Sequence, residues 1–379
     1  MPKIKKITFL SCVLVVFSMN VNGKVIQNNV ADNQRDSVLN YLFQSGMEGY
    51  NTFRIPALVT TTSGRILAFA EGRVNGRSDT GNIDLVMKYS DNDGKSWSPL
   101  IVVWDDGENV CGNPAPVVDT QTGDIYLLMT WNLGQDHEHQ IIDGESKDTR
   151  RVFVSHSSDN GESWSIPLEI TPSVKKFNWT WYATGPCHGI QLNSKKYRGR
   201  LVIPCDHIEA GTKKYYSHTI YSDDHGKSWH LGGTTPQDQV NECTVAELAD
   251  GRLLLNMRNY DRTQKVRKQS YSSDGGVTWG DIQPIVNLPE PICQASILSI
   301  KNGNKLLFLN PASSDSRTNM TLKVSSNNGK TWKIIRVLHE GPSAYSDLVL
   351  GKHKKLYCLY EAGIDSPYEG IVFESVIIK

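Results

Sequence analysis

Short runs of apolar and β-branched residues recur along the chain, and glycine, aspartate, asparagine or proline separates them. Six of the clearest runs cover residues 65–73, 124–132, 199–206, 251–259, 304–312 and 354–362. Several open on Gly or Asp-Gly, a pattern typical of β-hairpins. No stretch shows sustained helical periodicity, and no linker rich in Pro, Gly or Ser divides the chain. The pattern therefore predicts an all-β protein built from many short strands.

One polar motif follows several of the predicted strands. It reads Ser-x-Asp/Asn-x-Gly-x-Ser/Thr-Trp, and its five copies cover residues 90–97, 157–164, 222–229, 272–279 and 325–332. An Asp or Asn side chain can close a turn onto the backbone, and Gly supplies a backbone conformation with positive φ. We expect each copy to form a hairpin turn with its tryptophan packed beneath it, so we assign the motif a structural role and no catalytic one.

The spacing of this motif predicts a repeat architecture. Successive tryptophans of the motif lie 67, 65, 50 and 53 residues apart, which is typical of one supersecondary unit per copy. If residues 24–379 form one domain of six units, each unit has about 59 residues, enough for four antiparallel strands with their loops. We therefore predict a six-bladed β-propeller of four-stranded antiparallel blades. Five motifs are compatible with six blades because closing units are commonly atypical.

Composition and charge narrow the range of functions. The chain has 379 residues, of which 39% are hydrophobic and 21% charged, as is ordinary for a globular protein. Lys plus Arg equals Asp plus Glu at 40 each, so no overall electric field directs the protein to nucleic acid or to an anionic membrane. Any recognition of charge must be local.

The first 23 residues have the pattern of a signal peptide. A basic start precedes an apolar run over residues 7–19 that is too short to span a membrane. We expect cleavage near Gly23 and export to the periplasm or the medium, while Cys12 leaves a surface lipoprotein as a less favoured alternative. No later segment of the sequence is apolar for long enough to span a bilayer.

The six cysteines after Cys12 are scattered and show no CxxC spacing. They are Cys111, Cys187, Cys205, Cys243, Cys293 and Cys358. The pattern indicates neither a zinc site nor a small disulfide framework, so we expect thiols that pack as small buried side chains.

Three arginines stand on or beside hydrophobic strands in different repeats. Arg54 lies in "GYNTFRIPALV", Arg258 in "GRLLLNMRN" and Arg317 in "NPASSDSRTNMTLKVSS". A buried guanidinium needs an anionic partner because it cannot lose its charge. A structural salt bridge would explain each arginine alone, but three at corresponding blade edges could instead converge on one carboxylate.

Seven segments, in order from about residue 43 to the C-terminus, resemble the exo-α-sialidases (neuraminidases) of the bacterial type. They are "FQSGMEGYNTFRIPALV", "EGRVNGRSDTGNIDLVMKYS", "GNPAPVVD", "VNECTVAELADGRLLLNMRN", "CQASI", "NPASSDSRTNMTLKVSSNNGKTW" and "EGPSAYSDLVL". The FRIP motif together with five ordered turn motifs, called Asp boxes in this family, is a specific combination, whereas Asp boxes alone are not. The resemblance implies a hydrolase that releases terminal α-linked sialic acid from glycans and needs neither a cofactor nor a metal.

The resemblance also implies roles for individual residues. Those that match the triad binding the sialic acid carboxylate are Arg54, Arg258 and Arg317. Tyr345 in "SAYSDL" matches the nucleophile, Glu242 in "NECTVAEL" matches the base that takes its proton, and Asp79 in "GRSDTGNIDL" matches the general acid and base. The further sugar contacts that it implies are Arg73 near the 4-hydroxyl, Asn113 near the N-acyl group, and Gln294, which could equally support the fold.

The chemistry of the substrate agrees with these roles. Sialic acid carries its carboxylate on the carbon where the glycosidic bond breaks, so a neutral phenol approaches it without the repulsion that a carboxylate nucleophile would meet. A tyrosine with its usual pKa of about 10 needs an adjacent base, and Glu242 can supply one. Sialidases with a tyrosine nucleophile are known exceptions to the two-carboxylate rule of glycosidases. Two successive inversions then give net retention, with Asp79 protonating the leaving oxygen and later activating water.

Other polar residues are expected to stay outside the chemistry. We interpret Asp84 as structural. His137 and His139 lie in the polar segment 131–151, which we interpret as a solvated rim loop, because no third metal ligand follows at a suitable spacing. Cys187 stands where many sialidases have glycine, so the rim that receives the rest of the glycan is expected to differ in shape.

Two other classes of function stay open. A trans-sialidase or an intramolecular trans-sialidase would keep the same site and change the acceptor. A sialic-acid-binding propeller without activity would need the arginines but not Asp79, Glu242 or Tyr345, so we favour it least. The sequence does not define the linkage preference or the oligomeric state.

Overall fold

Strands dominate the computed structural model of the chain, which describes residues 39–351 and 355–378. The described residues belong to one compact unit that begins at Leu39. The predicted signal peptide and its cleavage site lie outside them. The prediction of an all-β protein is confirmed.

The first sheet has eight strands in the order β2-β3-β4-β6-β7-β8-β9, with β5 beside β4. Its strands are β2 (Thr52–Thr60), β3 (Ile66–Arg73), β4 (Ile83–Ser90), β5 (Ile101–Trp104), β6 (Val110–Val118), β7 (Ile125–Asn132), β8 (Arg151–Ser157) and β9 (Leu168–Glu169). A parallel bridge between Ile83 and Val110 joins β4 to β6. The sheet thus consists of two antiparallel halves, β2 to β5 and β6 to β9.

The next two sheets are smaller. The five-stranded sheet has the order β10-β12-β13-β14, with β11 beside β12, and the four-stranded sheet has the order β15-β16-β17-β18. Their strands are β10 (Trp179–Thr184), β11 (Ile190–Gln191), β12 (Leu201–Glu209), β13 (Tyr215–Ser222), β14 (His230–Thr234), β15 (Val240–Glu247), β16 (Leu253–Asn259), β17 (Val266–Ser272) and β18 (Gln283–Pro289).

The last sheet has seven strands in the order β1-β24-β23-β22-β21-β20-β19. Its strands are β1 (Tyr41–Gln44), β19 (Ser296–Ile300), β20 (Lys305–Pro311), β21 (Thr318–Ser325), β22 (Lys333–Leu350), β23 (Lys355–Ala362) and β24 (Gly370–Ile377). The exposed first part of β22 pairs with β21, and its buried last part pairs with β23. One long strand therefore ends one antiparallel group and begins the next.

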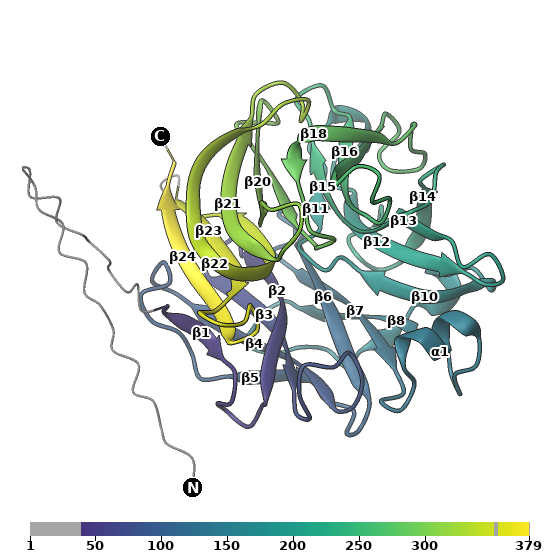
Figure 1. Cartoon of the computed structure of the whole chain (residues 1–379), viewed down its shortest axis with the longest axis vertical. Coiled ribbons are helices and arrows are strands. Elements are labelled where there is room, and N and C mark those ends of the chain that lie inside the picture. Colours follow the sequence, from purple (N-terminus) through teal and green to yellow (C-terminus); the bar gives the residue numbers. More distant parts are fainter. Residues whose placement is uncertain (1–38, 352–354, 379) are drawn as a thin grey trace, which may run out of the picture. The chain divides into compact units, whose positions relative to one another are not determined.

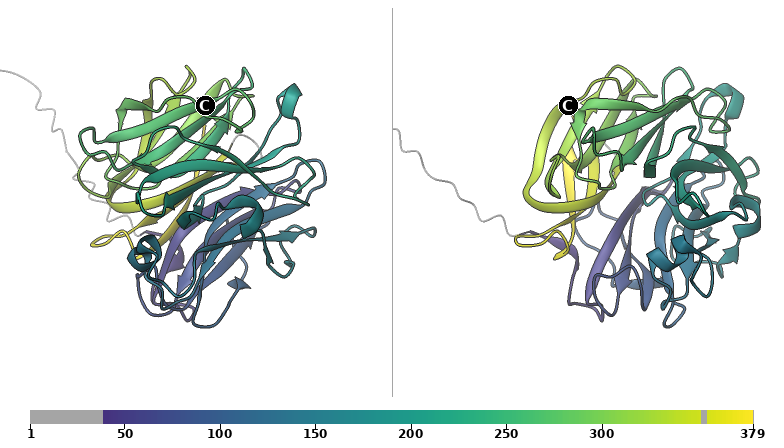
Figure 2. Two further views of the ribbon diagram at one scale, coloured as in Figure 1. Left: turned by 90° about the vertical axis from the view of Figure 1, so that its right-hand side faces the viewer. Right: turned by 45° about the vertical axis from the view of Figure 1, so that its right-hand side comes forward.

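The four sheets follow one another around a common centre, as expected for a propeller-like fold (Figures 1 and 2). The strands nearest the centre contact one another across sheet boundaries: β2 contacts β6 and β22, and β15 contacts β12 and β19. Side chains from strands far apart in sequence therefore meet there.

The five Asp boxes form hairpin turns, as predicted. In one copy Ser222 Oγ donates to Asp224 Oδ1 (2.9 Å) and accepts the backbone N–H of Gly226 (2.9 Å). Asp224 also accepts the backbone N–H (2.9 Å) and the hydroxyl (2.6 Å) of Ser228. The other copies repeat the bonds from the first serine and to the Asp or Asn.

The positions of the five Asp boxes explain why the antiparallel group that contains β23 and β24 has no Asp box. They connect β4 to β5, β8 to β9, β13 to β14, β17 to β18, and β21 to β22. In each case the turn joins the third strand of an antiparallel group to the outermost strand. The outer neighbour of β24 is instead β1, from the other end of the described chain, so no hairpin turn is needed there.

The hydrophobic core lies between neighbouring sheets and takes in tryptophans of the Asp boxes. One cluster joins Val117 and Leu128 from the first sheet to Ile203 and Ile220 from the second, with Trp229 among them. The six cysteines from Cys111 onward are buried and free, which confirms the prediction that they pack as small side chains.

The described helices are short: α1 (Glu138–Asp143), α2 (Thr171–Val174) and the 3-10 helix η1 (Lys195–Tyr197). The segment 131–151 was expected to be a solvated loop, but part of it forms α1, whose Gln140 and His137 make a capping box. In the part of the chain that the structure describes, no helix is long and apolar enough to cross a membrane.

Candidate active site

A cavity of about 580 Å³ opens among the inner strands of all four sheets. Eight of the nine site residues predicted from the sequence line it: Arg54, Arg73, Asp79, Asn113, Glu242, Arg258, Arg317 and Tyr345. They come from β2, β3, the loop after β3, β6, β15, β16, the turn before β21, and β22. The fold thus gathers residues that are widely separated in the sequence.

The inner strands are irregular where they reach the cavity. Register shifts fall at Arg54–Ala57, Gly112–Ala115, Trp179–Tyr182, Val240–Cys243 and Ser343–Ser346. Two of these register shifts contain a proline, which directly follows Ile55 in one and Asn113 in the other. Proline has no backbone N–H to donate to a neighbouring strand. A bulge turns side chains out of the regular alternation of a strand. The same irregularity therefore directs Arg54, Glu242 and Tyr345 toward the cavity.

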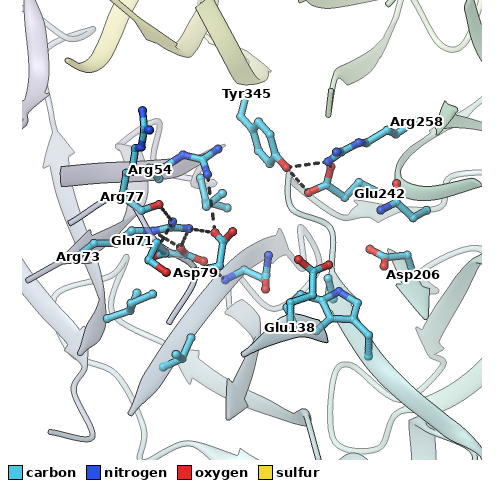
Figure 3. A pocket seen from close by; sticks show the side chains of 18 of the residues that line it. Arg54, Glu71, Arg73, Arg77, Asp79, Glu138, Asp206, Glu242, Arg258 and Tyr345 are labelled. Carbon is cyan, nitrogen blue, oxygen red and sulfur yellow. Dashed lines mark hydrogen bonds and ion pairs between the residues drawn. The ribbon is translucent and has the colours of Figure 1, made fainter. Parts of the chain in front are cut away.

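Tyr345 and Glu242 form a hydrogen-bonded pair, with Arg258 beside them (Figure 3). Tyr345 Oη donates to Glu242 Oε1 at 2.6 Å. Arg258 Nη1 donates to Glu242 Oε2 at 2.5 Å and to Tyr345 Oη at 3.0 Å. All three side chains are largely buried, so the charge of the guanidinium stabilises the carboxylate more strongly than it would in bulk water.

Burial raises the pKa of the Tyr345 phenol well above its usual value, and the Glu242 carboxylate raises it further. The nearby arginines oppose this shift but do not reverse it. The phenol therefore keeps its proton at neutral pH in the ligand-free site. Its oxygen can become a strong nucleophile only if the proton moves as the oxygen reacts, and Glu242 is placed to accept that proton.

Three arginines surround Tyr345. The guanidinium carbons of Arg54 and Arg317 lie 4.9 and 5.6 Å from the centre of its ring, and Arg258 contacts its hydroxyl. Arg317 Nη1 donates to Tyr368 Oη at 2.8 Å and its Nη2 donates to the carbonyl of Ile292 at 3.1 Å. Among the described residues, no carboxylate lies within ion-pair distance of Arg317, so its charge is free to bind an anionic ligand.

Glu361 of β23 holds Arg54 and was not identified from the sequence. It accepts Arg54 Nε at 3.1 Å and Nη2 at 3.3 Å. It also accepts the backbone N–H of Ile55 (2.9 Å) and of Tyr345 (3.1 Å). The fully buried carboxylate therefore fixes both the first arginine and the backbone of the tyrosine. A single acidic residue in a buried strand carries no spacing signal that would have revealed it.

Asp79 lies at the mouth of the cavity, in the loop between β3 and β4, and 54% of its side chain is exposed. Its Oδ1 is 2.7 Å from Arg73 Nη2 and 3.7 Å from Arg54 Nη1. Partial burial would raise the pKa of Asp79, but the charges of Arg73 and Arg54 outweigh it, and the pKa is lowered. In the ligand-free site Asp79 is therefore ionised at neutral pH.

Arg73 is fixed at the start of this loop. It bonds Glu71 through Nε (3.0 Å) and Nη2 (2.6 Å), and its Nη1 donates to the carbonyls of Arg77 (2.7 Å) and Ser78 (3.0 Å). Glu71 Oε1 in turn accepts the backbone N–H of Asn113 at 2.8 Å. Glu71, which the sequence reasoning missed, thus connects the two predicted sugar contacts.

The side chain of Asn113 is already engaged within the protein. Its Oδ1 accepts hydrogen bonds from Thr130 Oγ1 (2.9 Å) and from Arg150 Nη2. Arg150 lines the cavity as well, with its guanidinium carbon 4.0 Å from the ring centre of Trp181. The side of the cavity predicted to face the N-acyl group therefore contains a cation that was not identified from the sequence.

Gln294 does not line the cavity. Its Nε2 donates to the carbonyls of Pro186 (2.7 Å) and Ser346 (3.0 Å), and its Oε1 accepts the N–H of Ser346 (2.9 Å). The amide is used entirely in joining neighbouring inner strands, so its predicted sugar contact is replaced by a structural role. Asp84 also lies outside the cavity lining, where it accepts the hydroxyl of Tyr50 at 2.6 Å.

Two further acidic residues that the sequence reasoning missed line the cavity opposite Asp79 (Figure 3). Glu138 begins helix α1, and Asp206 lies in β12. Burial raises the pKa of Asp206 well above its usual value, and the charge of Glu242 adds to the effect. His137 and His139 flank Glu138, but within residues 39–351 and 355–378 no group of three or more His, Cys, Asp or Glu side chains could hold a metal ion.

Comparison with known proteins agrees with this geometry. The model of the BNR repeat-like domain matches residues 64–358. The exo-alpha-sialidase of Aspergillus fumigatus is 33% identical over 296 residues, which cover 73% of this chain and 68% of that protein. The sialidase of Bacteroides fragilis is 30% identical over 360 residues, which cover 88% of this chain and 64% of that protein. A solved structure, the Hadza microbial sialidase Hz136, has a TM-score of 0.80 at 29% identity, over 89% of this chain and 68% of that chain.

The propeller-like arrangement of sheets and the matched repeats place the protein in the class of glycosidases built from BNR repeats. Within that class the chain belongs to the sialidase family.

Proposed function

We propose that this protein is an exo-α-sialidase that hydrolyses terminal α-linked sialic acid on glycoproteins, glycolipids and oligosaccharides. The observation that carries the proposal is the 2.6 Å hydrogen bond from Tyr345 Oη to Glu242 Oε1 in a cavity lined by three triad arginines. A phenol beside a carboxylate is suited to covalent catalysis at an anionic centre. A cluster of arginines selects a substrate that carries a carboxylate.

In this proposal the reaction proceeds in two displacements. The Tyr345 oxygen attacks the anomeric carbon while its proton passes to Glu242, and the bond to the leaving oxygen breaks as Asp79 protonates that oxygen. Asp79 then removes a proton from water, whose oxygen attacks the anomeric carbon of the tyrosyl–sugar intermediate. The bond to the Tyr345 oxygen breaks, Glu242 returns its proton to that oxygen, and the sugar is released. Two inversions give retention of the α configuration. The arginines hold the carboxylate and offset the change of charge in the transition state.

Binding of the substrate would also prepare Asp79 for its role. The carboxylate of the sugar is expected to take over Arg54, which interacts with Asp79 at 3.7 Å in the ligand-free site. Neutralising Arg54 removes one of the arginine charges that lower the pKa of Asp79. The protonated form that a general acid requires therefore becomes more favourable once the sugar is bound.

The test is release of free sugar from a fluorogenic aryl α-sialoside by wild type and by Tyr345→Phe, with the anomer of the product followed by NMR. We expect wild type to release the α anomer first and Tyr345→Phe to lose at least about 100-fold in kcat. Transfer of the sugar to added lactose would indicate a trans-sialidase, and an anhydro product an intramolecular one. Binding without release in wild type would indicate a sialic-acid-binding protein.

We also infer six four-stranded blades. The inference is supported by the two antiparallel halves of the eight-stranded sheet, the two groups that meet in β22, and the two smaller sheets. The proposal of export to the periplasm or the medium depends on the pattern of residues 1–23 alone.

A further inference from the structure

The proposed nucleophile, Tyr345, lies in a bulge of β22. The register of β22 with β23 shifts between Ser343 and Ser346, where β22 has two residues between paired positions and β23 has one. A bulge leaves backbone groups without partners in the ladder, and buried backbone groups need partners. The position of Tyr345 therefore depends on groups outside the ladder of the sheet.

Buried side chains from other strands supply the missing partners. Glu361 accepts the backbone N–H of Tyr345 at 3.1 Å. Gln294 Oε1 accepts the N–H of Ser346 at 2.9 Å, and its Nε2 donates to the carbonyl of the same residue at 3.0 Å. The next residue along β22 is Asp347, whose side chain is fully buried. Three consecutive residues of β22 are thus tied to the interior, beginning with the tyrosine.

Asp347 joins β22 to two other segments. Its Oδ2 accepts the backbone N–H of Leu58 in β2 (2.8 Å) and of His188 (3.0 Å), which lies between β10 and β11. Its Oδ1 is 2.6 Å from His188 Nδ1 and accepts the N–H of Leu348 at 2.8 Å. Within the residues that the structure describes, His188 is the only residue within ion-pair distance of this carboxylate. Loss of the imidazole would leave a buried charge unpaired, which is unfavourable.

The imidazole of His188 is itself fixed in place. Burial alone would lower the pKa of His188, but the Asp347 carboxylate outweighs burial and the pKa is raised. This favours the charged ring, whose hydrogen bond to a carboxylate is stronger than a neutral one. Carbonyls of β12 and β6 accept the N–H groups of Gly185 (2.7 Å) and Gly189 (2.8 Å), on either side of His188. The other ring nitrogen, Nε2, has no partner among the described residues, so Asp347 alone orients the ring.

We propose that His188 is a positioning residue for Tyr345: by holding Asp347 it fixes the bulge of β22 that keeps the tyrosine hydroxyl on Glu242. The proposal rests on the sialidase activity proposed above. His188 does not line the cavity, so it acts through β22 and not on the sugar. Misplacing a reacting group by about 1 Å can cost about 100-fold in rate. Loss of His188 should therefore slow the attack by Tyr345 more than it weakens binding of the sugar.

The experiment separates attack from binding in His188→Ala. A 3-fluorosialosyl fluoride should trap the tyrosyl–sugar intermediate, and its rate of inactivation measures the attack because fluoride leaves without an acid. We expect this rate, and kcat/KM on an aryl α-sialoside, to fall by about 10- to 100-fold. The inhibition constant of free sialic acid should change by less than about 3-fold, because binding is left nearly intact. His188→Asn places an amide N–H near the position of Nδ1 and should regain most of the lost rate.

The matched control is His225→Ala. His225 Nδ1 is also 2.6 Å from a buried carboxylate, Asp119 Oδ2, but neither residue lines the cavity. This variant should lose stability in denaturant unfolding and should keep the inactivation rate of wild type. A folded His188→Ala that is inactivated as fast as wild type overturns the proposal. Equal losses in inactivation and in binding of sialic acid, which a purely structural role would produce, also overturn it.

Two further outcomes are covered by the same design. If His188→Ala does not fold, His188→Gln is measured by the same criteria, because its longer side chain carries the amide past Asp347. A wild type that neither cleaves the sialoside nor reacts with the fluoride rejects the proposed sialidase activity instead. A crystal structure of the His188 variant then decides, and an unchanged hydrogen bond from Tyr345 to Glu242 overturns the positioning role.

Discussion

The hydroxyl of Tyr345 in β22 donates to Glu242 in β15 across 2.6 Å, although 103 residues separate them in the chain. The bond joins two sheets at the centre of the molecule and is reinforced by Arg258, which contacts both groups. It defines a direct path for the phenol proton. The tyrosine is therefore paired with its proposed base before a substrate arrives.

Replacing Glu242 with Gln should abolish the base while retaining a hydrogen-bond acceptor for Tyr345. We expect kcat to fall by about 10²- to 10⁴-fold, the range for loss of one acid or base. Steady-state rates on an aryl α-sialoside measure the change. Glu340→Gln is the matched control, since Glu340 is exposed and lies outside the cavity lining. Activity of Glu242→Gln within a few-fold of wild type would exclude Glu242 as the base.

Substitutions of Arg54 and of Arg317 should both weaken substrate binding but should lower the stability of the protein by different amounts. Arg54→Ala leaves the buried Glu361 without its cation, and a broken buried pair typically costs about 3–5 kcal/mol of unfolding free energy. Arg317→Ala removes hydrogen bonds to Tyr368 and to a backbone carbonyl, which should cost about 0.5–1.5 kcal/mol each.

Both of these variants should raise KM, because each removes a proposed contact with the carboxylate of the sugar. Denaturant unfolding measures the stability of both variants, and steady-state rates on the same aryl sialoside measure their KM. Equal losses of unfolding free energy in the two variants would contradict the larger structural role of Arg54. Arg317→Lys should not restore KM fully, because an ammonium lacks the planar fork of a guanidinium.

Asp79 should matter most for substrates with a poor leaving group. We expect Asp79→Ala to lower kcat/KM by about 100-fold or more on sialyllactose. An aryl glycoside needs little protonation and should lose much less. Rates on the two substrates measure the difference, and equal losses would contradict a role as general acid.

The pH dependence of the same residue follows from its surroundings. Arg73 and Arg54 lower the pKa of Asp79 in the free enzyme, and the bound carboxylate should neutralise Arg54. The protonated form therefore persists to higher pH in the complex than in the free enzyme. In wild type, the loss of kcat with rising pH should lie at higher pH than the loss of kcat/KM. Coincident profiles would mean that Arg54 keeps its effect on Asp79 when the sugar binds.

The sequence predicted the strands and the Asp boxes because both are local patterns. Short apolar and β-branched runs bounded by turn residues specify strands, and Ser, Asp and Gly at fixed offsets specify a turn. It could not reveal that β1 pairs with β24, since no local pattern encodes a contact between the two ends of the chain. Helix α1 was not predicted for another reason: six residues are too few to show helical periodicity.

The candidate site was predictable where a residue lies in a recognisable motif. Tyr345, Glu242 and Asp79 do, and the cavity includes them. Glu361 and Arg150 do not, because their importance comes from neighbours in other strands, such as Arg54 and Asn113. Gln294 shows the opposite case: its motif suggested a sugar contact, but its amide joins two inner strands.

Asp224 offers a test of the Asp boxes that is independent of catalysis. Two of the five boxes carry Asn instead of Asp, and there Asn92 and Asn327 donate to the hydroxyls of Ser96 and Thr331. Asp224→Asn should therefore be tolerated, whereas Asp224→Ala leaves Ser228 and the turn without their acceptor and should cost about 1–3 kcal/mol. Urea unfolding at neutral pH measures both, and activity on an aryl sialoside should stay unchanged.

The same aspartate should make the stability of the protein depend on pH. Burial alone would raise the pKa of Asp224, but hydrogen bonds from Ser228 and Ser222 lower it to about 2. Because this pKa lies below that of the unfolded chain, about 4, the contribution of the group is fully present above that value. It is lost as the pH falls toward 2. The stability of wild type relative to Asp224→Asn should therefore decrease by about 1–2 kcal/mol between pH 6 and pH 2. A difference that stays constant over this range would show that Asp224 is not held as a carboxylate by the turn.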